Sequence, residues 1–69
     1  MNIEYYQRGL CYYGIGKYNQ AIKNYLKAIE INPHKGEVFT KLGRVYKVKG
    51  NYEMAIKSFN QAIQLEDKI

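Results

Sequence analysis

The chain is short and basic, and both properties narrow the classes of protein to which it can belong. It has 69 residues, of which 11 are Lys or Arg and 6 are Asp or Glu, so its formal net charge is +5. A chain of this length forms at most one small domain, which packing alone must hold together because a single Cys cannot form an internal disulfide. With one Cys and one His, the sequence predicts no metal site and no cofactor. The positive charge favours an acidic partner over a basic one.

The sequence also predicts that the protein is cytoplasmic. Its N-terminal segment lacks the basic start followed by an apolar run that a signal peptide requires. No apolar run approaches the roughly 18 residues that a membrane span needs. We therefore expect no membrane partner.

Residues 2 to about 15 predict a helix with more apolar surface than one buried face requires. Its apolar residues form two sets at helical spacing. The first set is Tyr5, Gly9 and Tyr12, and the second is Ile3, Tyr6, Leu10 and Tyr13. One set can enter the core, whereas the other needs a further explanation. Gly14 and Gly16 should end the helix, because glycine readily takes the left-handed conformation found at helix C-termini.

A second, amphipathic helix is predicted from Tyr18 to about Ile31. Its apolar stripe, at steps of three and four residues, is Tyr18, Ala21, Ile22, Tyr25, Ala28 and Ile29. The pair Asn32 and Pro33 should end it, because proline has no backbone N–H and disfavours the helical conformation in the preceding residue. His34 follows in the turn, with no nucleophile or acid at a useful spacing, and is interpreted as a solvated residue.

Two more helices are predicted in the second half of the chain. The third runs from about Glu37 to Lys49, and its apolar residues are Phe39, Leu42, Gly43, Val45 and Tyr46. The fourth begins after Asn51, whose side chain is placed to cap the free N–H groups of the first turn. Its predicted core stripe is Tyr52, Ala55, Ile56, Phe59, Ala62 and Ile63.

The second half of the chain repeats the first at a spacing of 34 residues. The identical pairs are Gly9 and Gly43, Tyr12 and Tyr46, Gly16 and Gly50, Tyr18 and Tyr52, Ala21 and Ala55, Ile22 and Ile56, Lys23 and Lys57, Ala28 and Ala62, and Ile29 and Ile63. A period of about 20 to 50 residues is typical of stacked-repeat proteins. We therefore predict an all-α fold of two helix-turn-helix hairpins, whose four antiparallel helices stack as a short α-solenoid. The single domain would span residues 1–69, with repeats at about 2–35 and 36–69.

The repeats resemble the tetratricopeptide repeat family, whose unit is a 34-residue helix-turn-helix. The residues that match its pattern are Tyr5, Gly9, Tyr12, Ala21, Tyr25, Ala28 and Pro33 in the first copy, and Phe39, Leu42, Gly43, Tyr46, Ala55, Phe59 and Ala62 in the second. Arg8 replaces a Leu of the pattern, so its charge must leave the core or find a partner. Asp67 replaces a Pro, which indicates that the stack ends or was cut there. Arrays usually need about three repeats and a polar capping helix, whereas this chain has two repeats and no cap.

The resemblance implies a protein that catalyses nothing and binds a peptide or another protein on the concave side of its first helices. That side would take Ile3, Tyr6, Leu10 and Tyr13 from the first repeat, and Thr40, Lys41, Arg44 and Lys47 from the second. Apolar in one half and basic in the other, it suits an acidic segment with apolar anchors. Alternatively, a neighbouring repeat or a second chain covers the apolar residues and the basic ones are simply solvated. The family's clamp for a C-terminal carboxylate is not expected, because Tyr6 and Leu10 occupy its places in the first copy.

Two other functions stay open at this point. In the first, the protein forms a homodimer in which Ile63 and Leu65 of the last helix, with Ile3 and Tyr6 of the first, are buried between copies. Exchange of a helical hairpin across the joint at 33–36 is one way to form it. In the second, the basic residues Lys41, Arg44 and Lys47 bind nucleic acid. Nucleic acid is disfavoured because six of the eight tyrosines occupy packing positions: Tyr5, Tyr12, Tyr18, Tyr25, Tyr46 and Tyr52. Only Tyr6 and Tyr13 would then be free. Cys11 aligns with Val45 and is interpreted as a small buried apolar residue.

Overall fold

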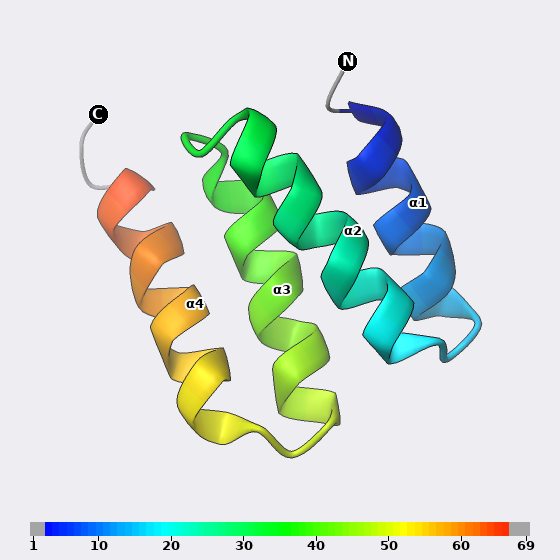
Figure 1. Cartoon of the computed structure of the whole chain (residues 1–69). Coiled ribbons are helices and arrows are strands. Elements are labelled where there is room, and N and C mark those ends of the chain that lie inside the picture. The colour runs from blue at the N-terminus through cyan, green and yellow to red at the C-terminus, as the bar shows by residue number, and fades with distance from the viewer. Residues whose placement is uncertain (1–2, 67–69) are drawn as a thin grey trace.

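Four helices pack side by side in the order in which the chain forms them. The computed structural model describes residues 3–66, which hold α1 (Ile3–Gly14), α2 (Tyr18–Ile31), α3 (Gly36–Val48) and α4 (Tyr52–Glu66). Each helix contacts the next one, so α1 and α4 lie at the two edges of the row (Figure 1). The predicted all-α fold of two hairpins is confirmed, with helix ends within one residue of those expected. No helix in the described range combines the length and the apolar character that crossing a bilayer requires.

The same backbone motif ends the first helix of each hairpin. Gly16 and Gly50 have φ angles of 81° and 86°, in the left-handed region that glycine occupies without a steric penalty. The N–H of Gly16 donates to the carbonyl of Tyr13, and the next N–H donates to that of Tyr12, at 3.1 and 2.8 Å. Equivalent bonds form at Gly50, so both turns are Schellman motifs. The predicted stop at Gly16 is confirmed, whereas Gly14 is the last helical residue of α1.

Short-range polar signals set the other helix ends. Asn32 has left the helical region, with φ −139° and ψ 87°, as expected of a residue before Pro33. The Oδ1 atom of Asn32 accepts a hydrogen bond of 3.3 Å from the N–H of the exposed His34, which is a solvated turn residue as predicted. The Oδ1 atom of Asn51 accepts a bond of 3.4 Å from the N–H of Met54, which confirms the predicted cap of α4.

The hydrophobic core is centred on α2 and the side of α3 that faces it. Its fully buried residues are Ala21, Tyr25, Ala28, Val38, Leu42 and Val45. Half-buried apolar residues pack around them: Tyr5, Tyr6, Leu10, Tyr12, Tyr13, Tyr18, Ile22, Ile29 and Tyr46. The predicted stripe of α2 is therefore confirmed. Burial of one side chain such as Leu42 contributes roughly 1.5 to 3 kcal/mol to folding.

Glycine lets the two helices of each hairpin approach closely. A β-carbon built at Gly9 would lie 2.5 Å from Cε1 of Tyr25, which is closer than non-bonded carbons can come. One built at Gly43 would lie 2.8 Å from Cε1 of Phe59. Each ring thus fills the space where a side chain of the neighbouring helix would otherwise stand.

Polar contacts join the two hairpins at both ends of α3. At its start, the hydroxyl of Tyr6 donates a hydrogen bond of 2.9 Å to Oε2 of Glu37. Just beyond its end, Nζ of Lys49 donates to Oδ1 of Asn19, which lies in the first turn of α2. Both bonds are exposed to solvent, so each contributes little alone. Together they fix α3 against the first hairpin at two separate points.

The predicted core stripe of α4 is only half correct. Ala55 and Ala62 are buried and Phe59 is half-buried, as expected. The other three members of the stripe are exposed: Tyr52 by 63%, Ile56 by 60% and Ile63 by 53%. The physical reason is coverage, because α3 covers the equivalent side of α2 and no fifth helix lies beside α4 within residues 3–66. Asp67, one of the two departures from the repeat pattern, lies outside the described residues.

The prediction that Cys11 is buried is wrong, since Cys11 is exposed. Cys11 and Arg8 align with Val45 and Leu42, which face α2 from α3. On α1 the same stripe faces away from α2, where the described residues place no helix, so nothing buries it. The guanidinium carbon of Arg8 lies 4.9 Å from the centre of the Tyr5 ring, within cation–π range. The charge of Arg8 therefore both leaves the core and finds a partner.

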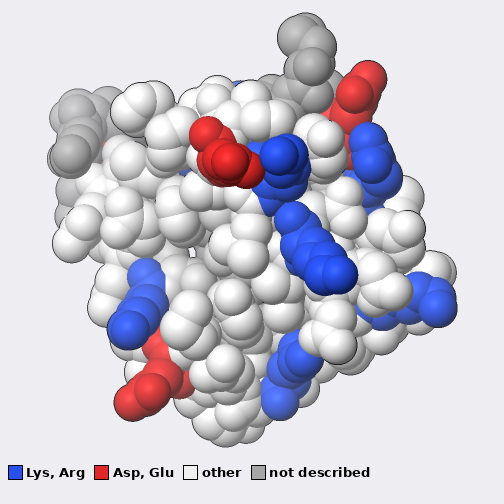
Figure 2. All heavy atoms as spheres, viewed as in Figure 1, with Lys and Arg blue, Asp and Glu red and all other residues white. Residues whose placement is uncertain are grey.

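On the face seen in Figure 1, charged side chains form no single dominant patch. Figure 2 shows Lys and Arg spread across the face seen in Figure 1, with wide uncharged areas between them. Within residues 3–66, one ion pair occurs, between Nζ of Lys27 and Oε1 of Glu30 at 3.4 Å. An exposed pair of this kind contributes at most about 0.5 kcal/mol. Stability must therefore come from the apolar core.

We expect Gly9→Ala to lower the free energy of unfolding by about 1–3 kcal/mol, because the added methyl group collides with the fully buried ring of Tyr25. Gly43→Ala should cost less, since its contact is longer and the half-buried Phe59 ring can move, whereas the better helix propensity of Ala offsets about 1 kcal/mol in both variants. Urea unfolding followed by circular dichroism measures both. Gly14→Ala is the control, because its β-carbon meets no atom within 4 Å. Equal stability of the Gly9 and Gly43 variants would contradict this account.

Candidate protein-binding face

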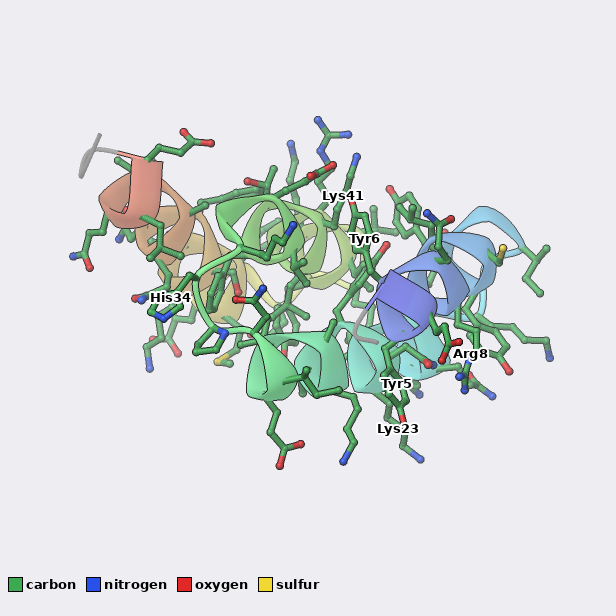
Figure 3. All side chains as sticks on the ribbon, turned by 90° about the horizontal axis from the view of Figure 1, so that it is seen from above. Tyr5, Tyr6, Arg8, Lys23, His34 and Lys41 are labelled. Carbon is green, nitrogen blue, oxygen red and sulfur yellow. The ribbon has the colours of Figure 1, made fainter. Side chains whose placement is uncertain are left out.

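The residues predicted to bind a partner come from α1 and α3, which meet on one side of the molecule. The bond from Tyr6 to Glu37 joins these helices directly, although α2 lies between them in the sequence. Figure 3 places Tyr6 and Lys41 on the same side, with Tyr5 and Arg8 on the other side of α1. We call this side the inner face and define it by Tyr6, Leu10, Tyr13, Glu37, Thr40, Lys41, Arg44 and Lys47.

The half of the inner face on α1 is apolar and supported by rings of α2. The Tyr6 ring packs against that of Tyr25 with centroids 6.1 Å apart, and the Tyr13 ring packs against that of Tyr18 at 5.7 Å. These tilted pairs are favourable arrangements of aromatic rings. The prediction that Tyr6 and Tyr13 are free is therefore wrong, because both are half-buried. Leu10, which lies between these two tyrosines in the sequence, is also half-buried and packs against the core.

The half of the inner face on α3 is basic. Arg44 and Lys47 are exposed, and Lys41 is half-buried. None of the three forms an ion pair with a carboxylate of the described residues. Their cationic groups are therefore available to a carboxylate brought by a partner.

Glu37 is a member of this face that the sequence prediction omits. It lies 34 residues after Ile3, so the repeat register assigns both to the same position. Once Ile3 was assigned to the binding face, the 34-residue repeat alone could have added Glu37 to it. The same register aligns Lys41 with Gln7, outside the predicted set of the first repeat. An acidic group thus lies at the start of α3, on a face predicted to be apolar and basic.

The other predicted residues contribute less to the inner face, or lie elsewhere. The Thr40 hydroxyl donates to the carbonyl of Gly36 in its own helix at 3.3 Å. The side chain of Ile3 lies outside the described part of the chain. Of the two residues predicted for self-association, Ile63 is exposed on α4. Leu65 is half-buried near the start of α3, where its β-carbon lies 3.6 Å from a β-carbon built at Gly36.

Two tyrosines of this region have raised pKa values. Burial, followed by the hydrogen bond to Glu37 and its negative charge, raises the pKa of Tyr6 from 10.0 to about 12. Burial also raises the pKa of Tyr25 to about 12, with a smaller contribution from Tyr13. Both phenols stay protonated near neutral pH, so Tyr6 remains a hydrogen-bond donor. In the described part of the chain, no group of three His, Cys, Asp or Glu residues could hold a metal ion.

Two stacked helical hairpins with a shared face built from their first helices define a helical-repeat protein. Residues 3–35 and 36–68 each match the tetratricopeptide repeat. The chain belongs to the tetratricopeptide repeat family, as the sequence pattern predicted. Repeats of this family generally mediate protein–protein interaction.

Similar proteins include parts of larger assemblies. Superkiller complex protein 3 of Homo sapiens is 34% identical over 59 residues, which are 86% of this chain and 4% of that protein. Anaphase-promoting complex subunit 3 of Schizosaccharomyces pombe is 30% identical over 64 residues, 93% of this chain and 10% of that protein. A crystal structure of MamA superposes with a TM-score of 0.95 at 34% identity, covering 97% of this chain and 39% of that one. The chain thus spans only a minor part of each relative's length.

We expect the free energy of unfolding to fall as the pH rises from 10 to 12. Both phenols bind their protons more tightly in the folded protein than at the ordinary pKa of 10.0, so their stabilising effect is complete below pH 10 and is lost through about pH 12. Ultraviolet titration of tyrosinate should show the ionisation of Tyr6 and Tyr25 in that range.

Tyr6→Phe isolates the Tyr6 contribution from the loss of lysine charge at similar pH. This variant should lose part of the late ultraviolet transition and part of the fall in stability above pH 10. A late transition of unchanged size in Tyr6→Phe would show that Tyr6 is not one of the shifted groups.

Proposed function

We propose that this chain is a non-catalytic interaction module whose inner face binds a peptide or protein segment that is acidic and carries apolar anchors. The observation that carries the proposal is the position of the half-buried rings of α1 beside the unpaired cations of α3. The two sets belong to different repeats, and the bond from Tyr6 to Glu37 holds their helices together.

The apolar half favours binding because its rings are already held in place. Tyr6 and Tyr13 rest on Tyr25 and Tyr18, so little side-chain entropy remains to be lost when a partner covers them. The part of each ring that is still accessible, together with Leu10, offers apolar area to an anchor side chain. Immobilising a free, rotamer-rich side chain would cost about 0.5–1.5 kcal/mol.

The charged half gives the face a direction. Glu37 lies in the first turn of α3 and Lys47 in its last, separated by roughly 15 Å at 1.5 Å per residue. A carboxylate of the bound segment is repelled by Glu37 and attracted by Arg44 and Lys47. The acidic end of the segment is therefore expected near the end of α3, with its uncharged or basic end near Glu37.

Nucleic acid fits these observations less well than an acidic peptide does. Stacking of bases needs open ring faces, whereas Tyr6 and Tyr13 pack against rings of α2. The carboxylate of Glu37, which lies on the same face, would further weaken binding by repelling the phosphates.

The experiment is a display selection of random 15-residue peptides on the purified protein. We expect the selected peptides to combine acidic residues with one or two large apolar residues. The double variant Arg44→Glu and Lys47→Glu should bind them at least about tenfold more weakly, because two charge-assisted contacts become repulsive. Fluorescence anisotropy at several salt concentrations measures the affinity, and circular dichroism checks that the helices are intact.

The control is the double variant Lys23→Glu and Lys57→Glu, which changes the net charge equally at exposed positions of α2 and α4. Its affinity should stay close to that of the original chain. If both double variants lose affinity equally, overall charge rather than the inner face is responsible. Selection of peptides without acidic residues would contradict the proposed ligand, and tight binding of single-stranded oligonucleotides with a steep salt dependence would favour nucleic acid.

A further inference from the structure

One side of α4 carries an apolar surface that the corresponding side of α2 keeps covered. This surface, the outer face of α4, consists of Tyr52, Ile56 and Ile63, which are 63%, 60% and 53% exposed. The residues 34 positions earlier are identical in type: Tyr18, Ile22 and Ile29. Those three are half-buried and pack against the core that α2 forms with α3. The same side chains on the same helix position are thus protected in one repeat and exposed in the other.

The α1 edge of another copy cannot cover this surface in the way that α3 covers α2. The buried stripe that α3 turns toward α2 is Val38, Leu42 and Val45, whereas α1 has Glu4, Arg8 and Cys11 at the corresponding positions. Stacking copies head to tail would bury the charges of Glu4 and Arg8 against Ile56 and its neighbours. Burial of unpaired charges in apolar surroundings is strongly unfavourable.

A second copy can instead present the same apolar surface. We propose that two copies of this chain associate through the outer faces of α4, related by a twofold axis and with the two helices antiparallel. Apolar residues then meet apolar residues on both sides, and the polar edge formed by Arg8 stays in solvent. A twofold contact uses the same surface of both chains, so assembly stops at a dimer. Head-to-tail contacts would instead leave a free surface at each end and add further chains.

The two isoleucines of α4 set the register of the proposed pair. Ile56 and Ile63 lie seven residues apart, so they share one side of the helix about 10 Å from each other. In the antiparallel arrangement Ile56 of each copy faces Ile63 of the other, which makes two equivalent contacts. The twofold axis then passes at the level of residues 59 and 60. The exposed Asn60 of one copy therefore approaches Asn60 of the other copy.

This interface differs from the self-association that the sequence predicted. Tyr6 is engaged with Glu37 in its own chain, and Leu65 lies against the start of α3. Neither is needed between copies, and Ile63 is the one predicted residue that the interface keeps. The proposal also goes beyond the inner face, which belongs to α1 and α3 and stays accessible in the dimer.

Sedimentation equilibrium of the 69-residue chain across micromolar to millimolar concentrations is the test. We expect a monomer–dimer equilibrium that holds or tightens at high salt, because apolar contacts are not screened. Ile56→Glu should weaken dimerisation at least about a hundredfold, since each dimer would bury two carboxylates, and should keep its helical circular dichroism. Leu26→Glu is the matched control, because Leu26 is a 46% exposed apolar residue on α2 outside the interface, and its variant should dimerise normally.

A cross-linking experiment tests the register. In a Cys11→Ser background, Asn60→Cys should form a disulfide-linked dimer under mild oxidation, whereas Leu26→Cys, at the equivalent position of α2, should not. The proposal is overturned by a monomer at all concentrations, by a mass that grows beyond the dimer, or by an Ile56→Glu variant that dimerises like the original chain. Failure of the peptide selection would leave these outcomes unchanged, because it concerns a different face.

Discussion

The close contact between a glycine of one helix and an aromatic ring of the next is the constraint on which this small fold depends. Gly9 receives the ring of Tyr25, and 34 residues later Gly43 receives that of Phe59. A chain of this size has few other means of stabilisation, since its single Cys can form no internal disulfide and the one ion pair within residues 3–66 is weak. Replacing the missing side chain with a ring buries large apolar area where two backbones meet. The pairing also fixes how each hairpin closes.

The two edges of the helix row have opposite chemical character. At α1 the outward stripe holds Arg8, whose guanidinium rests on the Tyr5 ring and remains in water. At α4 the outward stripe holds Ile56 and its apolar neighbours, with no charge among them. One edge is therefore compatible with solvent, whereas the other favours contact with a further apolar surface. The inner face lies between these edges and depends on neither.

Periodicity made most of the fold predictable from the sequence. The 3.6-residue spacing located the helices, while Gly16, Asn32 and Asn51 located their ends through local backbone chemistry that needs no tertiary information. Burial was less predictable, because it depends on which neighbour covers a stripe. The same apolar spacing gives a half-buried Ile29 on α2 and an exposed Ile63 at the equivalent position of α4. Cys11 was misplaced for the same reason.

The candidate face was predictable only in part. Its basic residues on α3 followed from the family resemblance, and the repeat register pointed to Glu37 as clearly as to Ile3. The packing of Tyr6 on Tyr25 was beyond sequence reasoning, because an apolar stripe does not reveal how far a long side chain can turn back over its own helix. The part of each tyrosine ring that stays exposed depends on how α1, α2 and α3 pack together.

The position of α3 between two polar contacts has a consequence for how the molecule comes apart. In a linear array, each repeat has an intrinsic stability and a coupling to its neighbour, and the ratio of the two decides whether repeats unfold singly or together. Here α3 supplies half of the core around α2 and is tied to the first hairpin through Glu37 at one end and Lys49 at the other. Nearly all of the coupling energy therefore resides in one helix. The two repeats can therefore separate only by releasing α3 from α2, so loss of α3 uncouples the two hairpins.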